Sequence, residues 1–379
     1  MKITVSVHGR FWAFELAKGL SQFGHLDQLL TTYPSFMVRK FVGSDMTLKT
    51  MPLLELRRRV YSKFAIDGNP DLSIAKRFGE FSKRHVRSDT DIFVGWSSAS
   101  LEAIKPAQDL GAKVIIERGS THIAAQTDVL RAAYKEFGLG FNETDVEIIE
   151  REEQEYMLAD KISVPSNYAA QTFVDRGISK NKIFINGYGV NLGLFQPPTT
   201  RPPDRKPRII FAGGVGIRKG VPWLLDAFKR LSSKAELHLI GPVSRDYEPM
   251  LRLSVGENIH VRGALPGSQL AKEYGRGDIF CLPSLEEGYG MVIPQAMACG
   301  LPVVTTHVVG AADLLEHGHN GLIVASGDRT ALADALVCLV DDAPLRQSMG
   351  ARALATVQSG QSWDDYVGRA IAFYEGLLA

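Results

Sequence analysis

Two glycine-rich stretches in the second half of the chain carry residues suited to binding a diphosphate or a sugar. In FAGGVGIRKG, residues 211–220, glycines follow an expected strand, and Arg218 and Lys219 open an expected helix. Glycines let a backbone approach a phosphate, and a helix N-terminus favours negative charge. A dinucleotide fingerprint is a poor match, because Lys219 stands at the third glycine position. Alternatively, the two bases are ordinary surface residues.

The second stretch, EEGYGMVIPQAMACG, covers residues 286–300. Glu287 opens a tight turn after an expected strand, and Gln295 lies about two helical turns further along. The first amides of a helix are free to donate, so the turn is suited to a phosphate or a sugar hydroxyl. Glu287 and Gln295 are placed to face the two ends of one elongated ligand. The alternative is a plain strand–helix connection with a buried cap.

Alternating strand and helix patterns are expected to position both stretches. The pattern predicts two doubly wound, Rossmann-like α/β domains with parallel sheets, whose strand ends face a central cleft. A Pro- and Gly-rich stretch at 186–207 interrupts the alternation and predicts the linker. The expected strands cover residues 2–7, 91–96, 113–117, 161–166, 208–214, 236–241, 258–263, 278–283, 301–306 and 321–326.

Composition excludes several classes of function. With 43 basic and 42 acidic side chains among 379 residues, the chain offers no global reason to bind nucleic acid. Three cysteines without CxxC spacing suggest neither a disulfide framework nor a metal knuckle. No signal-peptide core and no run of about 18 apolar residues is present. These features predict a cytoplasmic protein, with peripheral contact to the inner face of a membrane left open.

In order and spacing, three segments of the second half resemble the retaining glycosyltransferases of family 4, which have the GT-B fold. The segments are RKG, the long run from VRGALPGSQL to GLPVVTT, and HNGLIVASGD. The region from EREEQEYM to LGLFQP is similar to the family's connecting region. The resemblance implies an acceptor-binding domain at 1–190, a nucleotide-sugar-binding domain at 205–362, and a final helix at 363–379 that packs back on the first domain. It also implies metal-independent, retaining hexosyl transfer to a carbohydrate or lipid-linked acceptor in envelope or other glycan synthesis.

The resemblance assigns Arg218 and Lys219 to the leaving diphosphate and Glu287 to the donor sugar. Gln295 stands where a second acid usually grips the ribose, and the loss of charge implies binding weaker by about 1 kcal/mol. Many members have an arginine at Gly214. If Arg218 supplies that cation from the next turn, the electrostatics are restored, and if it does not reach, the leaving group is less stabilised. The remaining donor-side residues by resemblance are Gly9, Arg10, Leu265, Gly288, Tyr289, Gly290, Met291 and Val292.

On the acceptor side, ERGSTHIAAQ follows the expected strand at 113–117. The resemblance makes His122 the candidate catalytic histidine, with Arg118 and Ser120 beside it. The family often has its histidine where Arg118 stands, and His122 can equally be a helix-capping or packed residue. A plain turn is likewise an alternative for the HGRFW loop at 8–12.

The region 39–63 combines basic and apolar side chains, which suggests either contact with an anionic membrane or a solvated helix face over an ordinary core. Its basic residues are Arg39, Lys40, Lys49, Arg57, Arg58, Arg59 and Lys63.

Rival functions for the whole chain are a GT-B epimerase or phosphorylase, and a catalytically weak partner subunit. The last is made conceivable by Gln295 and Gly214.

Overall fold

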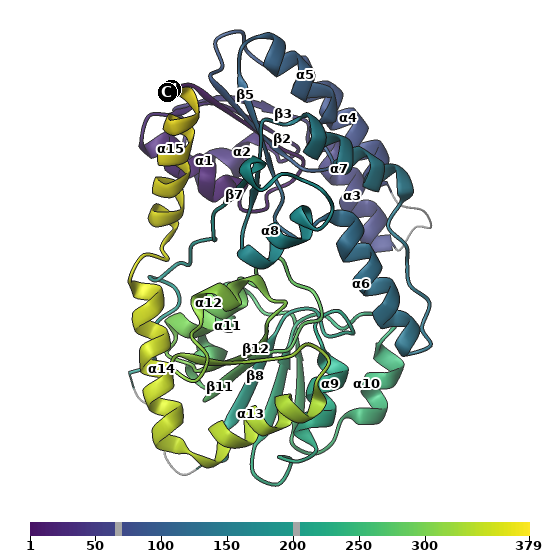
Figure 1. The fold of residues 1–379 in the computed structure, drawn as a ribbon, viewed down its shortest axis with the longest axis vertical. Helices are drawn as coiled ribbons and strands as arrows, with labels where there is room; N and C mark the ends of the chain where they lie inside the picture. The colour runs from purple at the N-terminus through teal and green to yellow at the C-terminus, as the bar shows by residue number, and fades with distance from the viewer. Residues whose placement is uncertain (65–69, 200–204) are drawn as a thin grey trace.

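The computed structural model describes residues 1–64, 70–199 and 205–379. Two sheets, one in each lobe of Figure 1, organise the chain. The first has seven strands in the order β3-β2-β1-β4-β5-β6-β7, and the second has six in the order β10-β9-β8-β11-β12-β13. All neighbouring strands are parallel. In both sheets the strand order runs outwards from a central strand in two directions, so the predicted pair of doubly wound domains is confirmed.

The strands of the first sheet that lie at its centre are buried along their whole length, as in ITVSV and IFVGW, because helices cover both faces. Its elements are β1 (Ile3–Val7), α1 (Ala13–Gln22), β2 (Leu26–Thr31), α2 (Ser35–Val42), β3 (Thr47–Thr50), α3 (Pro52–Phe64), α4 (Asp71–Lys83), β4 (Ile92–Trp96), α5 (Leu101–Asp109), β5 (Lys113–Glu117), α6 (Ile123–Glu136), α7 (Val146–Leu158), β6 (Lys161–Val164), α8 (Asn167–Val174) and β7 (Ile183–Ile185).

The second domain repeats the scheme with strands of similar length. Cys281 and Cys299 are buried in its core, and Cys338 is exposed. Its elements are β8 (Arg208–Ala212), α9 (Val221–Phe228), β9 (Glu236–Ile240), α10 (Glu248–Ser254), β10 (Ile259–Gly263), α11 (Gly267–Gly275), β11 (Ile279–Leu282), α12 (Val292–Ala298), β12 (Val303–Thr306), β13 (Gly321–Val324), α13 (Arg329–Asp341) and α14 (Ala343–Gln358).

The last helix, α15 (Trp363–Leu378), lies on the first domain beside α1, as Figure 1 shows. A capping box between Ser362 and Asp365 starts this helix. Val367 packs so tightly on α1 that a Cβ added at Gly19 would lie 2.4 Å from its side chain. The chain therefore crosses between the domains twice, and the crossings touch where the Val190 amide donates to the Gln361 carbonyl at 2.7 Å.

The elements left out of the sequence-based strand list include β2, β3 and β7. β2 contains the buried polar Gln28, and β7 has only three residues, so neither has a long apolar signal. Part of the predicted linker, residues 200–204, lies outside the described residues. Within the described residues, no helix has both the length and the apolar character needed to cross a bilayer.

Candidate functional site

The carboxyl ends of the two sheets meet at the boundary between the domains. The loop after β5 touches the turn after β11 so closely that a Cβ added at Gly288 would lie 2.3 Å from the Ser120 Cα. The Ser166 hydroxyl donates to the Gly288 carbonyl at 2.7 Å, and the Tyr289 hydroxyl donates to the Tyr188 carbonyl at 2.9 Å. The domains are therefore in direct backbone contact beside the candidate site.

The two glycine-rich stretches of the second domain converge at this boundary. Arg218 Nε donates to Glu286 Oε2 at 3.0 Å, and Lys219 Nζ contacts the Glu287 carboxylate. The Leu285 amide also donates to the Arg218 carbonyl at 2.9 Å, which ties the two loops together. Burial, and secondarily Arg218, lowers the pKa of Lys219 to about 7, while Glu286 opposes that shift. Two cations and two carboxylates thus form adjacent pairs.

The start of α12 supplies polar groups next to these pairs. Gly290 has φ +86°, a left-handed conformation that favours glycine and closes the turn before the helix. Met291 and Val292 stand at the helix start, where first-turn amides have no acceptor within the helix. Gln295 Oε1 is buried and has no protein partner among the described residues. An unsatisfied buried amide oxygen suits a ligand that brings a hydroxyl donor.

Other residues assigned to the donor side lie less directly on the site. Gly214 borders open space, whereas its neighbour Gly213 has φ +143°, and a Cβ added there would lie 3.8 Å from the Lys219 side chain. The Arg10 guanidinium lies 3.9 Å above the Phe41 ring in a cation–π contact. Leu265 lines a cavity of about 610 Å³ beside β10 and α11.

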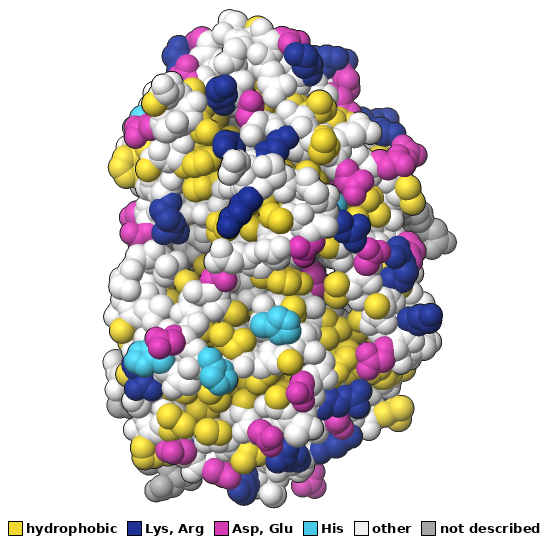
Figure 2. Space-filling view, viewed as in Figure 1, with side chains coloured by type: hydrophobic (Ala, Val, Ile, Leu, Met, Phe, Trp, Pro, Cys, Tyr) yellow, Lys and Arg dark blue, Asp and Glu magenta, His cyan; other side chains and the backbone are white. Residues whose placement is uncertain are grey.

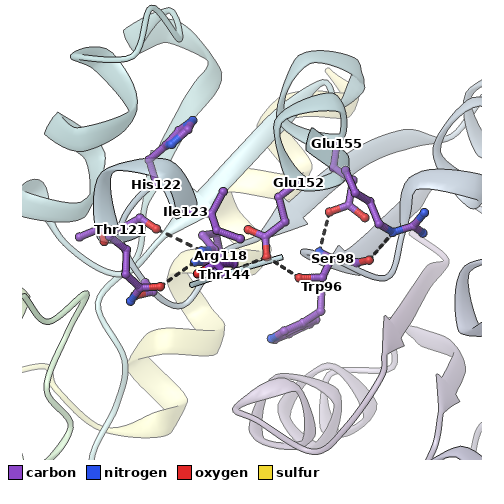
Figure 3. Close-up of polar contacts among 12 residues, drawn as sticks. Trp96, Ser98, Arg118, Thr121, His122, Ile123, Thr144, Glu152 and Glu155 are labelled. Carbon is purple, nitrogen blue, oxygen red and sulfur yellow. Dashed lines mark hydrogen bonds and ion pairs between the residues drawn. The ribbon is translucent and has the colours of Figure 1, made fainter. Parts of the chain in front are cut away.

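His122 occupies the N-cap of α6, where its Nδ1 accepts from the Ala124 amide at 3.2 Å. The ring packs edge-on against Tyr156 and Phe173 and points away from Arg118 in Figure 3. Burial, followed by the charges of Arg176 and Arg118, lowers the pKa of His122 to about 4, so the imidazole is neutral. This geometry matches the capping alternative for His122.

Arg118 instead joins a polar network of the first domain (Figure 3). Its Nη1 donates to Glu152 Oε1 at 3.0 Å, and its Nη2 donates to Gln126 Oε1 at 3.3 Å. Burial alone would lower the Arg118 pKa, but Glu152 and neighbouring acids raise it above its usual value. Glu152 also accepts from the Ser98 hydroxyl, and the Ser98 amide donates to Glu155 at 2.7 Å. Arg118 is therefore charged and held in place.

A cavity of about 230 Å³ lies between this network and the loop after β1. Sequence reasoning did not assign its aromatic walls, although Trp96 ends a predicted strand and Trp12 ends the HGRFW turn. Burial lowers the pKa of His8 to about 4, and its Nδ1 lacks a partner among the described residues. The cavity is lined by His8, Phe11, Trp12, Trp96, Ser97, Ser98, Arg118, Gly119, Ser120 and Tyr188.

One group of potential metal ligands, Glu236, His238 and His260, was found among the described residues. It lies on β9 and β10, and Arg208 Nε already donates to Glu236 Oε2 at 2.8 Å. The guanidinium competes with a metal ion for this carboxylate. The cluster is separate from the pairs formed by Arg218 and Lys219.

Comparison with known proteins identifies the second domain. Residues 206–342 match the family model of glycosyl transferases group 1. The second domain is therefore similar to that family. A D-inositol 3-phosphate glycosyltransferase of Xylanimonas cellulosilytica is 29% identical to this chain in an alignment of 235 residues that covers 56% of this chain and 56% of that protein. The chain spans about half the length of the curated relatives it matches.

Solved structures extend the fold assignment to both domains. Sucrose-phosphate synthase from Thermosynechococcus elongatus superposes with a TM-score of 0.73 at 19% identity, covering 99% of this chain and 98% of that one. HepE of Anabaena in complex with UDP gives a TM-score of 0.71 at 14% identity, with 99% and 100% covered. The two domains of this chain together form the GT-B fold.

Proposed function

We propose that this chain is a retaining, metal-independent glycosyltransferase that moves a hexosyl unit from a nucleoside diphosphate sugar to an acceptor hydroxyl. The observation that supports this most directly is the pairing of Arg218 with Glu286 and Lys219 with Glu287 at the domain boundary. The cations can stabilise the charge that develops on a leaving diphosphate, a role that metal ions have in other sites. The match of residues 206–342 to glycosyl transferases group 1 supports the same reaction class.

Donor binding in this proposal uses the second domain. The diphosphate would lie by Arg218 and Lys219 and the first amides of α12, and Glu287 would contact the donor sugar. The buried, unpartnered Gln295 Oε1 would accept from a ribose hydroxyl. Because the Gln295 amide carries no charge, this contact is weaker than a carboxylate would give.

Acceptor binding uses the aromatic cavity of the first domain. Trp12, Trp96 and Tyr188 offer ring faces and edges of the kind that pack on apolar faces of sugars, and the Ser97 and Ser98 hydroxyls offer polar partners. The charge of Arg118 is balanced by the Glu152 carboxylate, so the cavity favours an uncharged hydroxyl-bearing acceptor. The contact between Gly288 and Ser120 excludes water from the boundary between the two half-sites.

We also propose that the acceptor is linked to lipid and reached at an anionic membrane surface, where the first domain binds peripherally. Phe36 on α2 and Leu53 on α3 are 72% and 75% exposed. Arg39 and Lys40 are exposed beside Phe36, whereas Arg58 and Arg59 pair with Glu55. Figure 2 shows basic and apolar side chains intermixed over the first domain. The Lys63 side chain lies outside the described residues.

The decisive experiment screens UDP-, GDP-, ADP- and dTDP-sugars by thermal shift and then follows transfer. A ligand that binds only the folded state raises Tm, so at least one nucleotide should stabilise the chain. Release of the diphosphate should persist in EDTA, and NMR of the product should show the donor's anomeric configuration. No Tm shift with any nucleotide would refute the proposal.

The membrane proposal is tested by co-sedimentation with vesicles that contain anionic lipid. Binding should fall as the salt concentration rises, and absence of binding at low salt would refute this part of the proposal.

A further inference from the structure

Glu286, the residue before the assigned Glu287, is fully buried between the two domains. Both of its carboxylate oxygens accept hydrogen bonds. From the first domain, Thr121 Oγ1 donates to Oε1 at 2.6 Å, Gln126 Nε2 donates to Oε2 at 2.9 Å, and Ser120 Oγ lies 3.3 Å from Oε1. From its own domain, Arg218 Nε donates to Oε2 at 3.0 Å.

The charge of Glu286 is maintained despite its burial. Burial disfavours the carboxylate, but Arg218, Gln126 and Thr121 outweigh this effect and hold the pKa of Glu286 below its usual value. Every contact made to Glu286 comes from a donor. A neutral amide at this position would turn its N–H group toward the Thr121 and Ser120 hydroxyls, which can also accept, and Arg218 would keep an oxygen partner but lose a charged one.

The contact with Glu286 uses only one edge of the Arg218 guanidinium. Within the described residues, no protein acceptor contacts Arg218 Nη1 or Nη2, and the side chain is 37% exposed. Arginine presents its donors as a rigid planar fork, so fixing Nε fixes the direction of the remaining N–H groups. Glu286 therefore sets the direction of Nη1 and Nη2, through which Arg218 can bind an anion with two hydrogen bonds.

The same carboxylate connects Arg218 to the acceptor side. Gln126 donates to Glu286 through Nε2 and accepts from Arg118 through Oε1 at 3.3 Å, and Arg118 binds Glu152. These contacts form one continuous network of charged and polar groups across the boundary. The network exists only while the loop after β5 lies against the turn after β11.

We propose that Glu286 is a positioning residue that orients Arg218 toward the donor diphosphate only when the domains are closed. This inference rests on the proposed transfer reaction and adds a residue outside the Glu287 to Gln295 pair. With the domains apart, Glu286 would lose its three donors from the first domain, and Arg218 would lose its fixed direction. Transition-state stabilisation thereby depends on closure, so an open enzyme would release little sugar into water.

The domain contact itself does not depend on Glu286. Ser166 binds the Gly288 carbonyl, Tyr289 binds the Tyr188 carbonyl, and the Asn167 amide donates to Asp313 at 2.7 Å. Glu286→Gln should therefore leave the folded, closed arrangement in place. Asp313→Asn is a matched control, because it removes another interdomain carboxylate that does not contact Arg218.

The test measures nucleoside diphosphate release from the nucleotide sugar that gives the largest Tm shift. Glu286→Gln should lower kcat about tenfold to a hundredfold, as expected for a misplaced catalytic group, with little change in the donor KM. Asp313→Asn should leave kcat unchanged. In an Arg218→Ala background, Glu286→Gln should have little further effect, because the two residues act as one unit.

Three outcomes separate the possibilities. If the wild-type chain turns over no nucleotide sugar, the proposed function fails and this inference fails with it. If the wild type is active and Glu286→Gln retains full kcat, only the positioning role is refuted. Equal losses from Glu286→Gln in the wild-type and Arg218→Ala backgrounds would show a structural role independent of Arg218, and would also overturn the inference.

Discussion

Gly288 provides a direct test of whether domain contact is needed for activity. A Cβ at this position would lie 2.3 Å from the Ser120 Cα, 2.9 Å from the Ser120 carbonyl carbon and 3.0 Å from the Gly119 oxygen. All three atoms belong to backbone and cannot rotate away. Ordinary contact starts at 3.4 Å, so Gly288→Ala must separate the loops by about 1.1 Å, the difference between 3.4 and 2.3 Å.

The same displacement would lengthen the 2.6 Å bond from Thr121 to Glu286 beyond hydrogen-bonding range. Misplacing catalytic groups by about 1 Å can cost on the order of a hundredfold in rate, which is the expected loss in diphosphate release. Tm should change little, because each domain has its own sheet and core. Gly256→Ala is the control, since its Cβ meets nothing within 4 Å. Full activity in Gly288→Ala would refute the closed site.

Three further substitutions test other parts of the structure. Gln295→Glu should tighten nucleotide binding by about 1 kcal/mol in calorimetric titration, through a charge-assisted bond to the ribose; loss of binding would show that Gln295 is misplaced. His122→Ala should lower stability by about 1 kcal/mol by removing the α6 cap and leave turnover unchanged, whereas a large loss of kcat at saturating donor would restore a catalytic role. Burial raises the pKa of Glu117 from 4.5 to about 7, so its contribution to stability is present at low pH and is lost as pH rises through 7. Urea unfolding should therefore show that the free energy of unfolding of the wild type falls between pH 5 and pH 8. In Glu117→Gln this fall should be smaller by up to about 3 kcal/mol, and equal falls in the two proteins would contradict the prediction.

Local sequence patterns predicted the central strands and the two loops around Arg218 and Glu287. Buried parallel strands are nearly continuous apolar runs, and glycines and bases mark the loops that follow them. β2 was not recognised, because LDQLLT places Asp27 and Gln28 inside the strand. Only the sheet register shows that Gln28 belongs to a buried strand, paired with Thr4 and Thr47.

The residues missed at the site depend on contacts between distant segments. Glu286 and Gln126 are 160 positions apart, and nothing near either residue in the sequence indicates the bond between them. His122 was placed correctly near a strand end, but the direction of its ring follows from the start of α6 and from Tyr156 and Phe173. The sequence thus predicted the loops of the candidate site, while tertiary packing determined which side chains lie together there.

The packing of α15 on α1 has a consequence for how the protein is made. The groove at Gly19 stays uncovered while the ribosome translates the whole second domain, because Val367 reaches it only near the end of synthesis. A nascent first domain therefore exposes apolar surface that a chaperone can hold. The surface at Gly19 is therefore covered only after the second domain has been synthesised.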